Sequence, residues 1–154
     1  MNTTIRSPHG TNKETVRNLP DVRIIIAVLW VARMLSGLQG DTMRLSDPVM
    51  LQTTLANTGP VVASRELLLV MSIIFVVPIF MSFLTLTLKY PAIRWANRII
   101  GIFFAAFDLV FLGLALFLWR SAGYEIVWSI AYLVFTTLVV WYAWKWTIPE
   151  GQPS

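Results

Sequence analysis

Two residues of opposite charge, Arg33 and Asp108, stand inside long apolar stretches of the sequence. A carboxylate at the centre of a bilayer costs about 2.5 to 3.5 kcal/mol on insertion scales, so we expect it to face the protein interior beside a partner. An arginine at the same depth would be such a partner. The two side chains could fix the register of their helices, or the carboxylate could carry an ion that the arginine helps to release.

The spacing along the chain gives both charges the same predicted depth. Arg33 follows Arg23 by ten residues, and Asp108 follows Arg98 by ten. Arg23 and Arg98 each stand at the start of an apolar segment. Because a helix rises 1.5 Å per residue, both inner charges lie about 15 Å from the boundary at which their segments begin. If the two segments run in the same direction, the sequence predicts a central ion pair.

The composition indicates that these segments are membrane spans. The 154 residues are 56% hydrophobic and 13% charged, whereas a soluble domain carries about 25% charged residues. A spanning helix needs roughly 20 apolar residues, and four segments predict spans at about 22–39, 66–88, 98–119 and 124–146. The first is the weakest, because it is short and contains Arg33. A cleaved signal peptide is its rival interpretation, but the long polar leader and the internal arginine argue against cleavage.

We therefore predict an all-α fold, a bundle of four transmembrane helices over 21–148. A flexible cytoplasmic tail over 1–20 precedes the bundle, and a C-terminal tail over 149–154 follows it. The first loop outside the cytoplasm is the longest connection. Within it, Asp47 before Pro48 is typical of a helix start and predicts a short interfacial helix over 49–56.

The distribution of Lys and Arg predicts the orientation, since cytoplasmic loops carry an excess of both. Eight of them lie on the side of the two termini and three on the other side, with Arg33 inside the membrane. We therefore expect a multi-pass membrane protein with both termini cytoplasmic. The eight are Arg6, Lys13, Arg17, Arg23, Lys89, Arg94, Arg98 and Lys145, and the three are Arg44, Arg65 and Arg120.

Each predicted span also carries small or polar residues near the level of the two charges. Side chains three or four positions apart share one face of a helix, and such stripes predict a thin polar core around Arg33 and Asp108. Membrane serines and threonines more often pack or bond to backbone than bind a ligand, which is the alternative interpretation. The candidate residues of the polar core are Ser36, Pro78, Ser82, Tyr132 and Thr136.

Charged and aromatic residues near the predicted span ends have simpler interpretations. Asp41, Arg44 and Asp47 lie in the predicted first loop, where they are either solvated charges or guards of an opening toward the outside. The tryptophans of 141–146 are typical of interface anchors at the end of a span, and less typical of a stacking site.

Several chemistries have little support in the composition. There is no cysteine, and the one histidine, His9, lies in the polar tail, so disulfides, thiolate metal sites and histidine acid–base catalysis are not expected. We expect neither metal nor cofactor. The net charge of +4 comes from residues that flank apolar segments, which points to membrane orientation and away from nucleic acid. The expected partner is the lipid bilayer, with a homodimer or a second membrane protein left open.

Two motifs resemble those of a family of small bacterial four-helix membrane proteins of unknown function. They are Arg94-Trp95-Ala96-Asn97 and the tryptophan-rich run over 140–146, with Asp47-Pro48 and Pro78 also similar to the family's pattern. The resemblance covers 22–150 and implies the fold and topology, but no catalytic residue. Members often carry an acid two positions before the proline and another in the fourth span, where this chain has Val76 and Tyr132. That departure weakens any proton relay carried over from the family.

Three functional hypotheses follow. The first is a non-enzymatic bundle that is structural, an accessory subunit or a binder of a lipophilic molecule, because no nucleophile has a base near it in the sequence pattern. The second is a small ion-coupled transporter that uses Asp108, with Arg33 as its release partner. An enzyme is the third, and its only candidate residues would be Asp41, Asp47, Asp108 and Tyr132.

Overall fold

The protein is an assembly of α-helices in a computed structural model that describes residues 21–59, 62–118 and 123–146. Within these ranges it contains no strand. The predicted tails over 1–20 and 149–154 lie outside the described residues, as do residues 119–122. The elements are α1 (Val22–Ser46), α2 (Pro48–Ala56), α3 (Arg65–Thr87), α4 (Ala92–Gly113), a π-helical turn η1 (Leu114–Leu118) and α5 (Gly123–Lys145).

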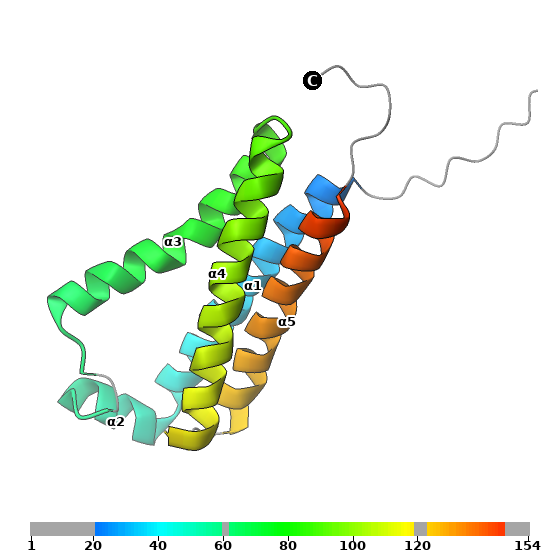
Figure 1. Ribbon diagram of the computed structural model, residues 1–154. Helices are drawn as coiled ribbons and strands as arrows, with labels where there is room; N and C mark the ends of the chain where they lie inside the picture. The colour runs from blue at the N-terminus through cyan, green and yellow to red at the C-terminus, as the bar shows by residue number, and fades with distance from the viewer. Residues whose placement is uncertain (1–20, 60–61, 119–122, 147–154) are drawn as a thin grey trace, which may run out of the picture.

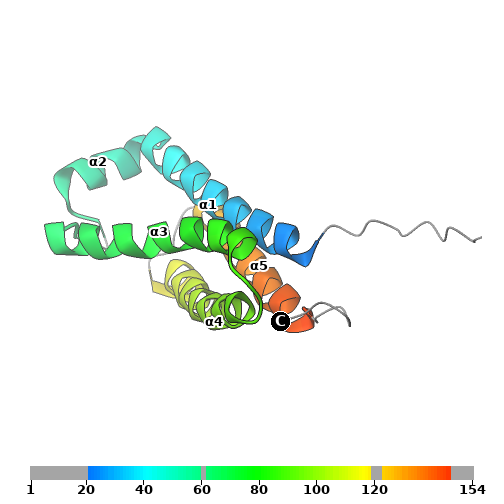
Figure 2. The same ribbon diagram turned by 90° about the horizontal axis from the view of Figure 1, so that it is seen from above.

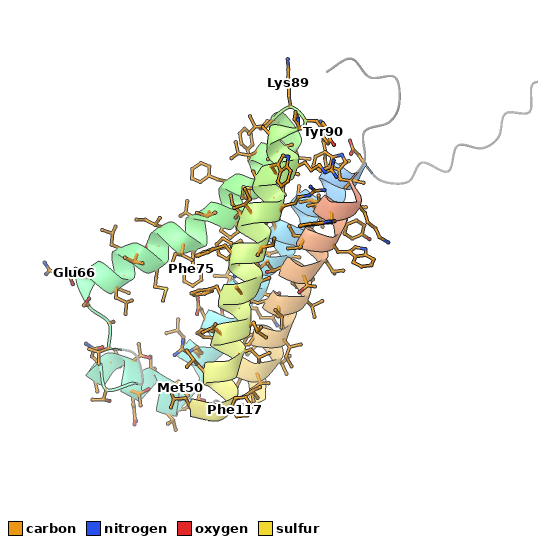
Figure 3. All side chains as sticks on the ribbon, in the orientation of Figure 1. Met50, Glu66, Phe75, Lys89, Tyr90 and Phe117 are labelled. Carbon is orange, nitrogen blue, oxygen red and sulfur yellow. The ribbon has the colours of Figure 1, made fainter. Side chains whose placement is uncertain are left out.

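Four of these helices are long and apolar enough to cross a membrane, which confirms the predicted all-α class and the presence of four candidate spans. The four are α1, α3, α4 with η1, and α5. Lys89 and Tyr90, between α3 and α4, lie at one end of the molecule, and Met50 and Phe117 lie near the other (Figure 3). The long axis of the bundle therefore joins these two ends.

Two helices are longer than the sequence predicts. α1 runs to Ser46, beyond the predicted end at residue 39, because its last two turns pack on α5: Gly40 lies under the ring of Trp128. α4 begins at Ala92, before the predicted start at 98, because Ile93 and Asn97 are buried in the core. Residues 92–97, which lie outside the predicted span, are therefore helical.

The predicted short helix after Asp47 is present as α2. The Asp47 carboxylate accepts hydrogen bonds from the backbone N–H groups of Val49 and Met50, and Pro48 occupies the first turn, where its missing N–H is not needed. Asn57 ends the helix in a left-handed conformation with φ of 52°. None of the α2 side chains is buried, so polar groups at its ends hold it in place.

α1, α4 and α5 form the compact part of the molecule, and α3 leaves it at an angle (Figures 1 and 2). α3 packs mainly against α1, and its buried residues are Pro78, Met81 and Thr85. From Arg65 to Val77 no side chain is buried. The described arrangement is thus a bundle of α1, α4, α5 and the second half of α3, from which the first half of α3 diverges.

The apolar core lies toward the end of the molecule that holds the α3–α4 connection. Its members come from all four long helices: Ile26, Trp30, Met81, Ile93, Phe104, Val139, Ala143 and Trp146. Trp30 and Phe104 meet edge to face with ring centroids 5.8 Å apart. Lipid tails are as apolar as leucine, so close packing and hydrogen bonds hold such helices together where the hydrophobic effect cannot.

Candidate functional site

Arg33 on α1 and Asp108 on α4 form the ion pair that the spacing predicts. Arg33 Nη2 lies 2.5 Å from Asp108 Oδ1, and Arg33 Nε lies 3.2 Å from Oδ2. The side chains are 2% and 3% exposed. The fork of the guanidinium thus holds both carboxylate oxygens, which is the strongest arrangement of such a pair.

Thr136 on α5 completes this polar site. Its hydroxyl oxygen accepts a hydrogen bond from Arg33 Nε at 3.0 Å. The same hydroxyl lies 2.7 Å from Asp108 Oδ2 and 2.9 Å from the backbone oxygen of Tyr132, and its single proton can be donated to one of them at a time. The site therefore links α1, α4 and α5 at one level.

Two aromatic rings cover the guanidinium of Arg33. Its Cζ atom lies 4.5 Å from the ring centre of Phe104 and 4.6 Å from that of Tyr132. A cation over an aromatic face is attracted by the ring's electrons, and more strongly where water is excluded. The rings thus offset part of the loss of hydration that burial imposes on Arg33.

The other predicted members of the polar core divide into two groups. Tyr132 and Thr136 touch the pair, whereas Ser36 lies half-buried one turn along α1 from Arg33. Ser82 makes no hydrogen bond to Arg33 or Asp108. Its hydroxyl donates instead to the backbone oxygen of Ile79 within α3. Pro78 is buried, but it has no polar group to offer. Pro78 and Ser82 therefore add no polar group to the site around Arg33 and Asp108.

Two of the three predicted loop charges, Arg44 and Asp47, connect to the start of α5. Arg44 Nε lies 3.1 Å from Glu125 Oε1, and the Tyr124 hydroxyl donates to Asp47 Oδ2 at 3.1 Å. Asp41 is exposed on α1. Arg44 and Asp41 stand on the extended end of α1, and so are not loop residues. The Arg44–Glu125 pair is partly exposed, and pairs of this kind stabilise by about 1 kcal/mol or less.

A second buried network, around Asn97 on α4, is not predicted by the sequence reasoning. Trp30 Nε1 donates to Asn97 Oδ1 at 2.8 Å, and Asn97 Nδ2 donates to Thr85 Oγ1 at 3.0 Å and to the Ile93 backbone oxygen at 2.9 Å. The network ties α1 and the second half of α3 to α4. Asparagine amides bond across membrane helices, but Asn97 lies between Arg94 and Arg98, where the sequence indicates the boundary of a span.

Arg98 is a second residue that the sequence reasoning assigns only to orientation. Its guanidinium donates to the backbone oxygens of Ala143 and Trp144 at 3.1 and 3.2 Å, and lies near the rings of Trp95 and Trp144. These oxygens belong to the last turn of α5, where the helix has no partners of its own for them. Arg98 therefore caps α5 from α4.

Replacing Asn97 with alanine is expected to lower the free energy of unfolding by about 1–2 kcal/mol, because the buried indole N–H of Trp30 loses its acceptor. Unfolding in detergent micelles measures the change. Trp30→Phe removes the donor of the same hydrogen bond. In the Asn97→Ala background it should therefore lower the free energy of unfolding only by the packing that the smaller ring loses. Equal stability of Asn97→Ala and the parent protein would contradict the network.

An apolar groove of about 370 Å³ lies between α3 and α4. One wall is on α3, immediately before Pro78, and the other is on α4. The lining residues are Ile73, Ile74, Val77, Ile99, Ile100, Phe103 and Phe104. Phe104 belongs both to this lining and to the cover of Arg33. The volume falls in the range typical of sites for small molecules, about 300–1,000 Å³.

The described residues offer little for covalent or metal chemistry. No three His, Cys, Asp or Glu side chains come together in the ranges that the structure describes. Asp108 is held by Arg33 and Thr136, so it is not free to act as a base in this arrangement. No family model, curated protein or solved structure matches the chain. The site therefore has to be interpreted from its own geometry.

Proposed function

We propose that this is a non-enzymatic membrane protein that holds a lipophilic molecule in the groove between α3 and α4. The observation that carries the proposal is the groove itself, about 370 Å³ in volume and lined by seven apolar side chains. Both of its walls belong to helices that can span a membrane. Its occupant would therefore enter sideways from the hydrocarbon phase.

The division of α3 supports this assignment. The second half of the helix is anchored by Met81 and Thr85, while the half that carries Ile73, Ile74 and Val77 has no buried residue. Pro78 stands between the halves and removes one backbone hydrogen bond there. One wall of the groove is thus on α4, and the other is on a part of α3 that packs on the core through Ile74 and Val77 but has no fully buried side chain.

A photoreactive alkane tests the proposal. The protein is reconstituted in lipid nanodiscs, labelled with a long-chain alkyl diazirine and digested, and the labelled residues are mapped. We expect labelling to concentrate on 73–77 and 99–104 and to fall when excess unlabelled alkane is added. Uniform labelling of all lipid-facing helix surfaces, without competition, would mean that the groove is ordinary lipid-exposed surface.

A matched pair of variants on α4 sharpens this experiment. Ile99 lines the groove and Ile102, on the same helix, does not, although both side chains are exposed, at 64% and 48%. Ile99→Trp is expected to fill part of the groove and to reduce labelling of α3. Ile102→Trp adds the same side chain outside the groove and is expected to leave labelling unchanged.

The ion-coupled transporter is the competing proposal. It needs an Asp108 that gains and loses a proton or ion, and both oxygens of this carboxylate are bound to Arg33. Substrate-dependent proton movement in vesicles, abolished by Asp108→Asn, would favour the transporter. We prefer the binding function because the groove needs no rupture of a buried ion pair.

We infer a location from the sequence on separate grounds. The excess of Lys and Arg on one side favours an orientation with both termini in the cytoplasm, and the resemblance to a bacterial family favours the inner membrane. The motifs over 94–97 and 141–146 support membership of the four-helix family that they resemble. Reporter fusions at the two ends of the chain would test the orientation.

A further inference from the structure

The guanidinium of Arg33 uses only part of its hydrogen-bonding capacity. Nε and Nη2 hold Asp108, and Nε also meets Thr136. Nη1 is buried and has no hydrogen-bond partner among the described residues. An unsatisfied buried donor is unfavourable, most of all on a charged group, so native structures rarely leave one unpaired. Arg33 Nη1 can therefore donate a hydrogen bond to one more acceptor.

Phe104 contacts both the guanidinium of Arg33 and the apolar groove. The Cζ atom of Arg33 lies 4.5 Å from the centre of the Phe104 ring, and the Phe104 side chain also lines the groove. None of the other six lining residues contacts Arg33 through its ring or a hydrogen bond. A movement of the Phe104 ring would therefore connect the groove with Arg33.

The charge balance restricts which acceptor fits. Arg33 and Asp108 form a neutral pair, and both are nearly fully buried. An added carboxylate or phosphate would leave one net negative charge deep in the bundle, which is costly. An added cation would meet the positive guanidinium. An uncharged oxygen acceptor, such as the carbonyl of a ketone or ester, satisfies Nη1 without changing the net charge.

We propose that the groove takes an uncharged lipophile that carries a carbonyl group, and that this carbonyl accepts a hydrogen bond from Arg33 Nη1 when the Phe104 ring moves aside. The inference rests on the proposed function and adds the chemical class of the ligand. The alkyl part of the molecule occupies the seven-residue groove, and its one polar atom reaches the buried donor.

Two probes of equal length test this inference: an alkane and a long-chain methyl ketone with an isotope-labelled carbonyl. Each is titrated against the photoreactive alkane on the reconstituted protein. We expect the ketone to compete about tenfold better than the alkane, which corresponds to about 1.4 kcal/mol. The infrared band of the bound carbonyl is expected to shift to lower frequency, as it does on accepting a strong hydrogen bond.

A double variant, Arg33→Met with Asp108→Leu, is the matched control, because it removes the donor together with its counter-charge. It should bind the alkane as before and lose the advantage of the ketone. If the ketone and the alkane compete equally on the parent protein and the carbonyl band does not shift, this inference is overturned while the groove function stands. If neither probe competes, the groove function is overturned. A fatty-acid anion that binds better than the ketone would overturn the charge argument.

Discussion

Replacing Asp108 with leucine is expected to destabilise the protein by about 3–5 kcal/mol, the range measured when one partner of a buried ion pair is removed. The guanidinium of Arg33 would remain, 1% exposed, with the Thr136 hydroxyl as its one remaining side-chain acceptor. Unfolding in detergent micelles, followed by circular dichroism, measures the change. Arg33→Met is expected to be equally damaging, because it leaves a buried carboxylate.

The double variant Arg33→Met with Asp108→Leu tests whether stability requires the two charges themselves or only that neither charge is left without its partner. Buried pairs replaced by apolar residues of similar volume are often as stable as before, so Arg33→Met with Asp108→Leu should recover most of the loss. Asp108→Asn, which keeps the shape, should reduce the folded yield in detergent, as should Arg33→Gln. Normal yields for both single variants would show that the pair is not sheltered in the folded protein.

The contact between Arg33 and Asp108 could be predicted because it depends only on the cost of a charge in lipid and on the depth of each charge along its helix. Charges are rare within the apolar segments, each costs free energy in lipid, and the rise per residue places them at one height. Thr136 was predicted in the polar core for the same reason of helical spacing, and it contacts both charges. A pattern of this kind fixes a contact because any other arrangement would leave a charge in lipid.

The course of α3 could not be predicted in this way. Its residues are the most apolar of the four spans, and apolar side chains are equally compatible with lipid and with protein. Hydropathy therefore identifies the span without stating what it packs against. The division at Pro78 follows from Thr85 and Met81, which bind the second half to the core through tertiary contacts.

Helix ends were mispredicted for a related reason. The extension of α1 contains Asp41 and Arg44, which are typical of a loop by composition, but Arg44 pairs with Glu125 on α5. Arg98 was interpreted as a marker of the span boundary, yet it is buried against the last turn of α5. In both cases the arginine binds a partner that is distant in the sequence. The residues close to the arginine in the sequence do not indicate that partner.

The close approach of α1 and α5 depends on glycine, and Gly37→Ala is expected to lower the free energy of unfolding by about 1–3 kcal/mol, as overpacking does. A Cβ atom at residue 37 would lie 1.8 Å from the Tyr132 hydroxyl oxygen and 2.9 Å from its Cζ. The Tyr132 ring would have to move, and it would then leave the face of Arg33, which it meets at 4.6 Å. Unfolding in the same micelles measures the effect.

Gly113→Ala is the matched control for this prediction. Gly113 ends α4, and a Cβ there meets nothing within 4 Å, so alanine should leave stability unchanged or raise it slightly through its better helix propensity. Tyr132→Phe removes the hydroxyl that meets the new methyl group, so in the Gly37→Ala background it should restore part of the loss. An interaction energy above about 0.5 kcal/mol between the two substitutions indicates direct contact. If Gly37→Ala were as harmless as Gly113→Ala, α1 and α5 would not meet at this level, and Tyr132 could not be the ring that covers Arg33.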